Sequence, residues 1–588
     1  MDTNNKQNNN SFDSSLFIGF VQQVNPGFVM IHIPASNLLK LHHINGEKHH
    51  PGLVGSYVTI EGEEFGFIGK ILELDLPEKE RMELTEQRFE SEDLHPRARV
   101  EILISFDYYK IRKINKGLDT FPHVGARVFS CSSQFLQKYL FEFGVNNTSD
   151  DTLIDLAVLS SNQSSEVKVS SQSLFGRHCA VVGTTGGGKS WSVQKLIEEI
   201  VNNNGKAILI DATGEYQPYC VDKRIDSVAM GIDTYFDFSR LTVSDIFYLL
   251  KPSDKVQRPK LLDAIRSLKM VRINGKGKTE LQEKKDDSVF TIAIEDGILK
   301  KSGCDKKAYD ISYYRHIAQI ENNRLDFDIT KLSRQLVQEC VWDPDIKDKT
   351  KYGSINQSDV SFCVSLVSRV NNLTVTKEFG NLFGFRDENK KGKTDLATKI
   401  ESFLADSTKN LLRISLRDVE FEFQVREILV NSIGRFLLEK ARASEFKKKG
   451  SLIVFIDEAH QFLNKSVQDE YYSEQKLDSF DLIAKECRKH CLFICLATQN
   501  PRDIPLGTLS QMGTFIVHRL INRLDKEAIE NACSSANRSI LSFLPILGSG
   551  EALLIGVDFP MPLSVKIKPP RFKPDSKTPS VISKVGSQ

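Results

Sequence analysis

Ten residues, Val181 to Ser190, restrict the fold of this chain more than any other feature. They read V-V-G-T-T-G-G-G-K-S, which contains the G-x-x-x-x-G-K-S pattern, and they lie between an apolar run and an amphipathic stretch. Glycines at these positions let backbone N–H groups surround phosphates, and the N-terminus of the following helix adds a positive dipole. The pattern therefore predicts a phosphate-binding loop between a buried strand and a helix.

The loop also predicts the cofactors, which are ATP and Mg²⁺. Lys189 is expected to reach the β- and γ-phosphates, and the Ser190 hydroxyl is expected to ligate Mg²⁺. The other loop residues expected to bind the nucleotide are Gly183, Thr184, Thr185, Gly186, Gly187 and Gly188.

A second motif supplies the acids that such a site needs. The apolar run Leu452–Ile456 is followed directly by Asp457 and Glu458. An acid at the end of a strand can hold the Mg²⁺ shell, and a second can deprotonate the attacking water. We expect Asp457 to take the first role and Glu458 the second. Residues 457–460 also spell DEAH, as in one group of RNA helicases, but the gap of 267 residues after Ser190 is too long for that core.

The pattern of apolar runs predicts an α/β domain after a β domain. Before residue 165, short alternating runs are separated by turn signals, which is typical of a small barrel or sandwich. From about residue 175, continuous apolar runs alternate with helical stretches, as in a parallel sheet covered on both faces. Charged connectors and helical pieces interrupt this alternation between about 240 and 420.

These changes in composition define the expected organisation. The last segment carries six basic residues and one acid from residue 566 on, so it is expected to cross a neighbouring subunit, touch phosphate or be a solvated tail. The expected segments are a disordered Asn-rich tail (1–13), an N-terminal β domain that is a small barrel or sandwich (14–165), two parts of a P-loop ATPase core (166–240 and 421–560), a mainly helical insertion (241–420) and an extended basic arm (561–588).

Composition excludes several classes of protein. With 78 Lys and Arg against 77 Asp and Glu, the chain is not a general nucleic-acid coating protein, so any nucleic-acid site must be a local basic surface. It contains no apolar run of about 18 residues, and its polar start has no secretory core, so no membrane partner is expected. Ten scattered cysteines fit a reducing, cytoplasmic location.

The order of the motifs resembles the HerA family of hexameric ATPases, relatives of the FtsK DNA translocases. The resemblance implies a RecA/FtsK-like parallel sheet with an N-terminal barrel and an inserted helical subdomain. Five features carry it: the β-like N-terminal region, the phosphate loop Gly183–Ser190, the D-A-T-G-E-Y segment Asp211–Tyr216, the acidic strand ending in Ile456–His460, and the segment Glu486–His490 that leads into a strand ending in T-Q-N-P, 498–501.

The resemblance also implies roles for further residues. Asp211 and Glu215 are expected to shape the Mg²⁺ or water site, or else to form a structural turn. Gln499, with Thr498, is expected to sense the γ-phosphate. Arg488 is a candidate arginine finger and Arg177 a second, although either is also consistent with a surface ion pair. The resemblance does not assign these arginines to the same or the adjacent subunit.

The implied activity is that of a homo-hexameric, ATP-hydrolysing motor that translocates or unwinds double-stranded DNA. Relatives work with a partner nuclease, or in bacterial antiphage defence with a nuclease or a sirtuin-like NADase. The chain has no nuclease motif of its own, so an effector protein is expected to dock on the barrel face. Two alternatives remain: a conjugation-type DNA-pumping ATPase, and a regulatory ATPase scaffold that assembles and activates effector subunits.

Three other groups of residues are interpreted without a special function. The histidines His42, His43, His49 and His50 are expected in an exposed loop rather than at a metal. The cysteines Cys487, Cys491 and Cys495 are expected to pack in the core rather than bind iron and sulfur. The lysine runs 390–393 and 447–449 are expected to be solvated, with DNA phosphate contact in a ring channel as the alternative.

Overall fold

A computed structural model describes most of the chain. The described residues are 12–44, 47–82, 94–108, 118, 120–132, 134–137, 152–160, 165–274, 277–285, 288–419, 424–463, 477–536, 538–559 and 561–576. Most of the predicted N-terminal tail therefore lies outside the described residues. Phe12 is an exception, because its ring packs edge-on against Tyr108 and Phe129, with 5.5 Å between ring centroids in each pair.

The described N-terminal residues form a closed, antiparallel barrel of six strands. Alternate residues point inward, so Val29 and Ile31 are fully buried, as are Val58 and Ile60 on another strand. The strands, in spatial order, are β1 (Phe17–Asn25), β2 (Phe28–His32), β7 (Arg97–Asp107), β6 (Phe65–Asp75), β5 (Tyr57–Ile60) and β8 (Arg127–Ser130).

The second unit is a sheet that contains eleven strands within the described residues. Its centre and one side are parallel, and four antiparallel strands extend the other side. The order is β10 (Glu166–Ser170), β9 (Leu153–Leu159), β24 (Leu563–Ile567), β23 (Glu551–Gly556), β22 (Thr514–Val517), β11 (Cys179–Val182), β21 (Leu492–Thr498), β20 (Leu452–Ile456), β12 (Lys206–Asp211), β19 (Leu411–Ser415) and β13 (Ile225–Ala229).

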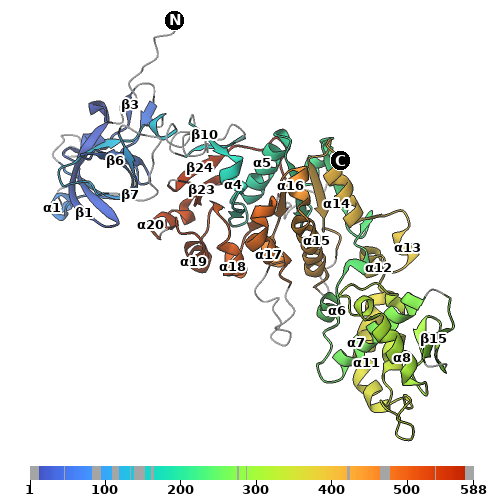
Figure 1. Cartoon of the computed structure of the whole chain (residues 1–588). Coiled ribbons are helices and arrows are strands. Elements are labelled where there is room, and N and C mark those ends of the chain that lie inside the picture. The colour runs from blue at the N-terminus through green and yellow to red at the C-terminus, as the bar shows by residue number, and fades with distance from the viewer. Residues whose placement is uncertain are drawn as a thin grey trace, which may run out of the picture.

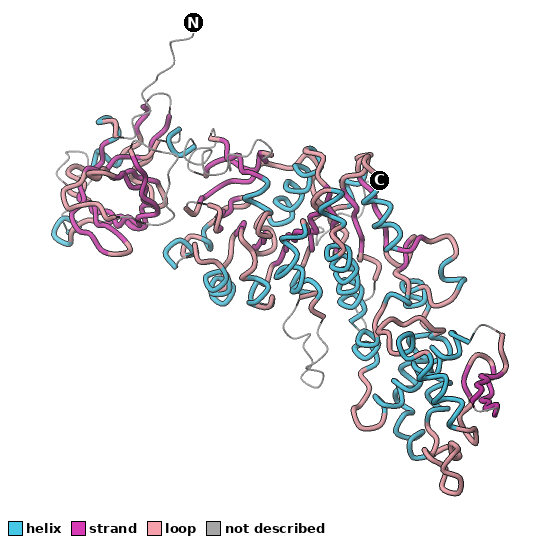
Figure 2. Tube along the Cα trace, in the orientation of Figure 1, coloured by secondary structure: helices cyan, strands magenta, loops and turns pink. Residues whose placement is uncertain are grey.

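Helices cover both faces of this sheet, and the predicted fold class is confirmed (Figures 1 and 2). The helix α5 (Lys189–Asn202) packs on one face, with Val193, Leu196 and Ile197 fully buried in one apolar cluster. The opposite face is covered by α15 (Val425–Arg442) and α17 (Ser479–Glu486), whose buried apolar side chains belong to a second apolar cluster.

Three expected segment limits differ from the structure. The strand β9 falls inside the expected barrel segment, β19 inside the expected insertion and β24 inside the expected arm, yet all three belong to the large sheet. In β24, the side chains of Leu563, Val565 and Ile567 are buried between β23 and β9. A short alternating strand looks alike in a barrel and at a sheet edge, so only its pairing partners distinguish the two.

The insertion lies at the end of the sheet opposite the barrel (Figure 1). It is built around a group of helices, but it also contains a small three-stranded sheet that was not expected. Its main elements are α6 (Val243–Leu250), α7 (Gln257–Asn274), α8 (Lys306–Arg315), α10 (Leu332–Glu339), α11 (Gln357–Val375), α12 (Lys377–Phe383), α14 (Leu396–Ala405), β15 (Glu280–Lys285), β16 (Ser288–Glu295) and β17 (Ile298–Leu299).

Hydrogen bonds and a cation–π contact join the barrel to the region of β24 in the large sheet. The Lys70 ammonium group donates to Ser564 Oγ at 2.9 Å and lies 4.6 Å from the centroid of the Phe543 ring. The Tyr57 hydroxyl donates to the Pro562 carbonyl at 3.3 Å.

Within the described part of the chain, no helix is both long and apolar enough to cross a bilayer.

Candidate active site

The phosphate loop connects β11 to α5, as the sequence pattern predicts. Gly186 and Gly188 have φ values of +76° and +111°, a region that favours glycine. Gly183 is required for another reason: a Cβ there would lie 2.6 Å from the Cβ of His518. The loop is thus held in a conformation that directs its backbone toward the first turn of α5.

The loop lysine contacts both acids at the end of β20. Lys189 Nζ lies 2.5 Å from Glu458 Oε1 and 3.7 Å from Asp457 Oδ1. All three side chains are almost fully buried, with exposed fractions of 6%, 6% and 1%. The strands β11 and β20 are parallel neighbours of β21, so their carboxyl ends meet at one edge of the sheet.

Gln499, just after β21, joins the acid to the loop. Its Nε2 donates to Glu458 Oε1 at 2.6 Å, and its Oε1 accepts from the Thr185 hydroxyl at 2.6 Å. Thr498 lies deeper and is within 3.3 Å of His460 Nδ1. Of the two residues expected to sense the γ-phosphate, Gln499 is therefore the one in contact with Glu458.

The two acids of the D-A-T-G-E-Y segment after β12, Asp211 and Glu215, make different contacts. Glu215 reaches the loop, where its Oε2 accepts from the Ser190 hydroxyl at 2.8 Å. Asp211 accepts from the Gly214 N–H at 2.8 Å and from Arg413 Nε at 2.7 Å. Asp211 therefore shapes the turn that presents Glu215, instead of contacting Lys189 or Ser190.

The electrostatics of the site suit a divalent cation. Burial raises the pKa of Asp457 to about 7 against the effect of Lys189, and Glu458, Asp211 and Glu215 raise it further. Burial also raises the pKa of Glu215. Asp457 Oδ1 and Glu458 Oε2 are buried and accept no hydrogen bond from the described residues, although His460 Nδ1 lies 3.3 Å from Glu458 Oε2. Mg²⁺ prefers oxygen ligands, so Ser190 and Asp457 fit the role of holding it.

The two arginine-finger candidates lie away from this edge. Arg177 precedes β11, and its Nε is 3.3 Å from Asp558 Oδ2. Arg488 is exposed in a short 3₁₀ segment, Cys487–His490, that precedes β21. Because β11 and β21 are parallel, residues before them lie at the amino ends of the strands, opposite the loop. Within one subunit neither arginine is brought to Lys189.

Two residues of the site had not been singled out from the sequence. Arg413 on β19 is 3% exposed and pairs with the fully buried Asp211, and its NH1 also donates to Ser227 Oγ at 3.0 Å. It is the only charged residue in the run Leu411–Ser415, which is the one signal that the sequence offers. Its importance depends on the pairing of β19 with β12, which no local pattern reveals.

His518, after β22, is the second such residue. Its Nδ1 lies 2.8 Å from the Glu551 carbonyl, and its Nε2 lies 2.7 Å from Ser192 Oγ. A carbonyl can only accept, so Nδ1 carries the hydrogen and Nε2 accepts from the hydroxyl. Burial lowers the pKa of His518 to about 4, so the neutral ring supports the loop glycines and α5.

The histidine group departs from the expected exposed loop. His42, His43 and His49 lie in the paired strands β3 (His42–Ile44) and β4 (Glu47–His49), and His49 is buried. The described residues contain no cluster of three potential metal-ligating residues. Cys495 is buried in β21 opposite Cys179, and all ten cysteines are free. In the lysine runs, Lys390 pairs with Asp237 at 2.7 Å, whereas Lys447 and Lys448 are exposed.

The fold and the site define this chain as a P-loop ATPase with an N-terminal barrel. Comparison with protein-family models identifies the family within this class. The model described as "Helicase HerA, central domain" matches residues 154–370, and "Helicase HerA-like C-terminal" matches 439–577, which together exceed half of the chain. The chain belongs to the HerA family.

Similar proteins agree with this assignment. "Probable helicase MJECL08" of Methanocaldococcus jannaschii is 24% identical over 428 residues, covering 71% of this chain and 70% of the relative. "Probable DNA double-strand break repair helicase HerA" of the same organism is 23% identical over 420 residues, covering 68% and 73%.

Solved structures show more distant similarity. The bacterial conjugative coupling protein TrwB has a TM-score of 0.43 at 12% identity, covering 75% of this chain and 94% of that chain. VirB4 of Thermoanaerobacter pseudethanolicus has a TM-score of 0.44 at 11% identity, covering 73% and 99%. These likenesses are too distant to add to the assignment.

Proposed function

We propose that this chain is the subunit of a homo-hexameric, ATP-driven motor that translocates or unwinds double-stranded DNA. The observation that carries the proposal is the buried contact between Lys189 and Glu458 at the phosphate loop. This contact supports Lys189 as the phosphate-binding lysine and Glu458 as the base of one site. The chain belongs to the HerA family, and similar proteins are named DNA repair helicases.

Each site residue takes a role consistent with its contacts. The loop from Gly183 to Ser190 binds the phosphates of ATP, and Lys189 leaves Glu458 to contact them. Ser190 and Asp457 hold Mg²⁺, which neutralises phosphate charge when bound. Glu458 accepts the proton of the attacking water. The remaining contacts orient this machinery: Gln499 fixes the Glu458 carboxylate and Glu215 fixes the Ser190 hydroxyl.

The position of the arginines is consistent with the proposed ring. Arg488 is exposed, and the described residues offer it no ion-pair partner. An exposed arginine at the edge opposite the loop is available to the site of an adjacent subunit, where it would neutralise charge in the transition state. Arg177 is the second candidate and would first have to leave Asp558.

The proposed partner is an effector protein, a nuclease or a sirtuin-like NADase, that docks on the barrel in antiphage defence. The barrel region exposes large apolar side chains that a docked partner would cover: Phe20 is 40% exposed, Leu53 56%, Val54 51% and Val124 65%. Ten free cysteines accord with a reducing compartment, and we include a cytoplasmic location in the proposal.

ATP hydrolysis by the purified chain tests this proposal. Turnover would be measured with and without linear duplex DNA, alone and with the product of the adjacent gene, using Lys189→Ala as the blank. Turnover stimulated by DNA and abolished in the blank supports the motor. Nucleotide binding without turnover in any condition contradicts it and favours a nucleotide-gated scaffold. Association of the purified complex with a membrane channel would favour the DNA-pumping alternative.

A further inference from the structure

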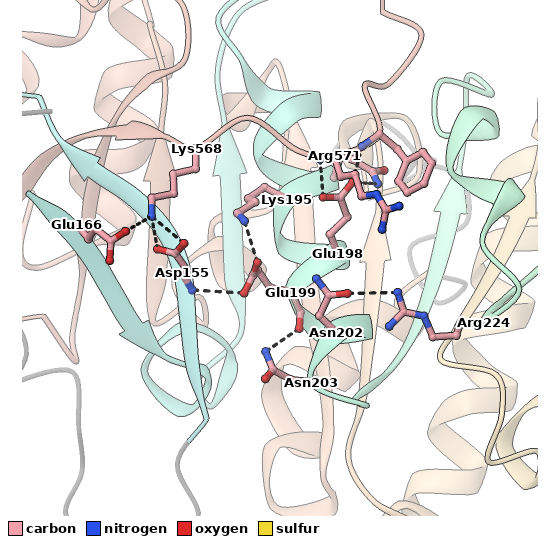
Figure 3. A network of polar contacts seen from close by, with 12 residues as sticks. Asp155, Glu166, Lys195, Glu198, Glu199, Asn202, Asn203, Arg224, Lys568 and Arg571 are labelled. Carbon is pink, nitrogen blue, oxygen red and sulfur yellow. Dashed lines mark hydrogen bonds and ion pairs between the residues drawn. The ribbon is translucent and has the colours of Figure 1, made fainter. Parts of the chain in front are cut away.

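The described chain after β24 runs over the phosphate-loop helix α5, and its last described residues lie beside the loop after β12 that carries Glu215. We name residues 568–576 the C-terminal strap. The sequence predicts that this basic segment crosses a neighbouring subunit, touches phosphate or is a solvated tail. Residues 568–576 make contacts within their own subunit, so the solvated-tail alternative is wrong for them. Figure 3 shows the strap above α5, with its polar contacts to that helix and to β9 and β10.

The first anchor of the strap is an ion pair at the edge of the sheet. Lys568 Nζ lies 2.7 Å from both carboxylate oxygens of Asp155 and 2.8 Å from Glu166 Oε1. Its backbone N–H donates to the Leu156 carbonyl at 3.0 Å. These contacts fix where the strap leaves the sheet. The ion pairs are partly exposed, so they contribute little stability by themselves.

The second anchor is a buried carboxylate on α5 itself. Glu198 accepts two successive backbone N–H groups of the strap, from Arg571 at 2.8 Å and from Phe572 at 2.9 Å. Glu198 is only 5% exposed, so these charge-assisted bonds are stronger than ordinary ones. The ring of Phe572 also packs against Tyr219, with 5.2 Å between centroids. The strap is therefore docked on the helix that begins with Lys189.

The strap then reaches the nucleotide site. Lys573 Nζ lies 5.8 Å from the centroid of the Trp191 ring, one residue beyond Ser190. The N–H of Asp575 donates to the backbone carbonyl of Glu215 at 2.8 Å. The Glu215 side chain in turn accepts from the Ser190 hydroxyl. The strap thus contacts both sides of the Ser190–Glu215 pair, the helix on one side and the acidic loop on the other.

We propose that the C-terminal strap is a positioning element of the nucleotide site. It holds the Glu215 loop against the first turn of α5, so that the Ser190 hydroxyl is directed by Glu215 before Mg²⁺ and nucleotide arrive. The strap touches no reacting atom and acts through Glu215 and Ser190. The inference rests on the proposed role of Ser190 in holding Mg²⁺.

One substitution removes only the hydrogen bond between the strap and the backbone of Glu215. Asp575→Pro removes the N–H that donates to Glu215 and leaves the anchors at Lys568 and Glu198 in place. Ser576→Pro is the matched control, because the N–H of Ser576 makes no hydrogen bond with any described residue. Both variants would be made with Trp342→Phe, which leaves Trp191 as the single tryptophan of the chain.

Two measurements on these variants need no turnover. The first is acrylamide quenching of Trp191, which reports contact between the strap and α5. The second is the Mg²⁺ concentration that half-saturates binding of a non-hydrolysable ATP analogue. Partners that orient metal ligands typically change metal affinity by 10-fold or more, so we expect Asp575→Pro to raise this concentration about 10-fold. We expect Ser576→Pro to leave it unchanged.

A second variant guards against a general loss of folding. Glu198→Gln keeps the size of the side chain and one acceptor oxygen but loses the charge, so we expect a smaller shift in the same direction. In a Glu215→Gln background, Asp575→Pro should have no further effect on the Mg²⁺ requirement. An unchanged Mg²⁺ requirement in Asp575→Pro overturns the positioning role, whether or not Trp191 becomes more accessible.

The experiments distinguish a failure of the motor proposal from a failure of the strap inference. If the wild type binds the analogue with Mg²⁺ but does not hydrolyse ATP, the motor is wrong while the Mg²⁺ titration still decides the role of the strap. If the wild type hydrolyses ATP and Asp575→Pro behaves as Ser576→Pro does, the strap inference alone is wrong.

Discussion

Lys189 Nζ and Glu458 Oε1 lie 2.5 Å apart, and each of the two side chains is only 6% exposed. The lysine needed for phosphate binding is thus paired with the carboxylate proposed as the base. If Lys189 binds phosphate as we propose, nucleotide competes with Glu458 for the same ammonium group, and we expect phosphate binding to weaken this contact.

The first prediction concerns that base. Glu458→Gln keeps the shape of the side chain but removes its basicity, so we expect kcat for ATP to fall at least about 100-fold while nucleotide binding persists. Steady-state hydrolysis and binding of a fluorescent ATP analogue would separate the two effects. Equal loss of binding and turnover would show that Glu458 is needed to organise the site rather than to accept a proton.

The second prediction concerns Gln499, which positions that carboxylate. Gln499→Ala removes its hydrogen bonds to Glu458 and Thr185, so we expect kcat to fall about 10- to 100-fold with a smaller change in KM. Gln511→Ala is a suitable control, because this exposed glutamine precedes β22 at the opposite edge of the sheet. A change in KM alone would indicate a contact with the substrate in its ground state.

The third prediction concerns the position of the arginine finger. Arg488→Ala and Lys189→Ala subunits should each be inactive alone. If Arg488 acts on the adjacent subunit, rings mixed in equal amounts should recover about a quarter of wild-type turnover, since a complete site needs one intact residue from each neighbour. No recovery would place Arg488 outside the site of the neighbour. The same mixture with Arg177→Ala compares the second candidate.

The fourth prediction concerns the buried pair Arg413 and Asp211. Arg413→Met leaves a fully buried carboxylate without its cation, so we expect the free energy of unfolding to fall by about 3–5 kcal/mol. Adding Asp211→Asn should restore part of that loss, which chemical denaturation would measure. If the double variant loses as much unfolding free energy as the two single variants added together, the pair itself is not the source of the effect.

The fifth prediction concerns pH and the contact between barrel and sheet. Burial lowers the pKa of Lys70 from 10.5 to about 8, with Glu101 opposing that shift. Between these values the unfolded chain binds the proton more tightly, so the contribution of Lys70 to stability rises as the pH increases from about 8 to 10.5. Below pH 8 the buried ammonium group is charged and its full desolvation cost remains.

Lys70→Met should remove this dependence. Between pH 8 and pH 10.5, the wild type should gain up to about 3 kcal/mol relative to the variant, measured by chemical denaturation at each pH. Substitution of the exposed Lys40 by methionine should leave the pH profile unchanged. Parallel profiles for the wild type and Lys70→Met would contradict the depressed pKa.

The sequence alone predicted the elements that depend on local chemistry. The loop from Gly183 to Ser190 needs glycine at positive φ, a lysine and a hydroxyl in fixed order, so its position and its helix could be predicted without a structure. Asp457 and Glu458 could be placed at the same edge, because parallel strands end together. Within each of these two motifs the residues lie within a few positions of one another, so each motif leaves a visible pattern.

Tertiary structure alone decided which distant segments complete the site. Arg413, His518 and Asp575 lie on strands or segments far from the loop in sequence, and their roles follow from pairing and docking that no short pattern encodes. The same reason explains the segment limits: β9 and β24 alternate as edge strands do anywhere, and only their neighbours assign them to the large sheet. Local spacing determines which groups a segment offers, whereas packing determines which groups meet.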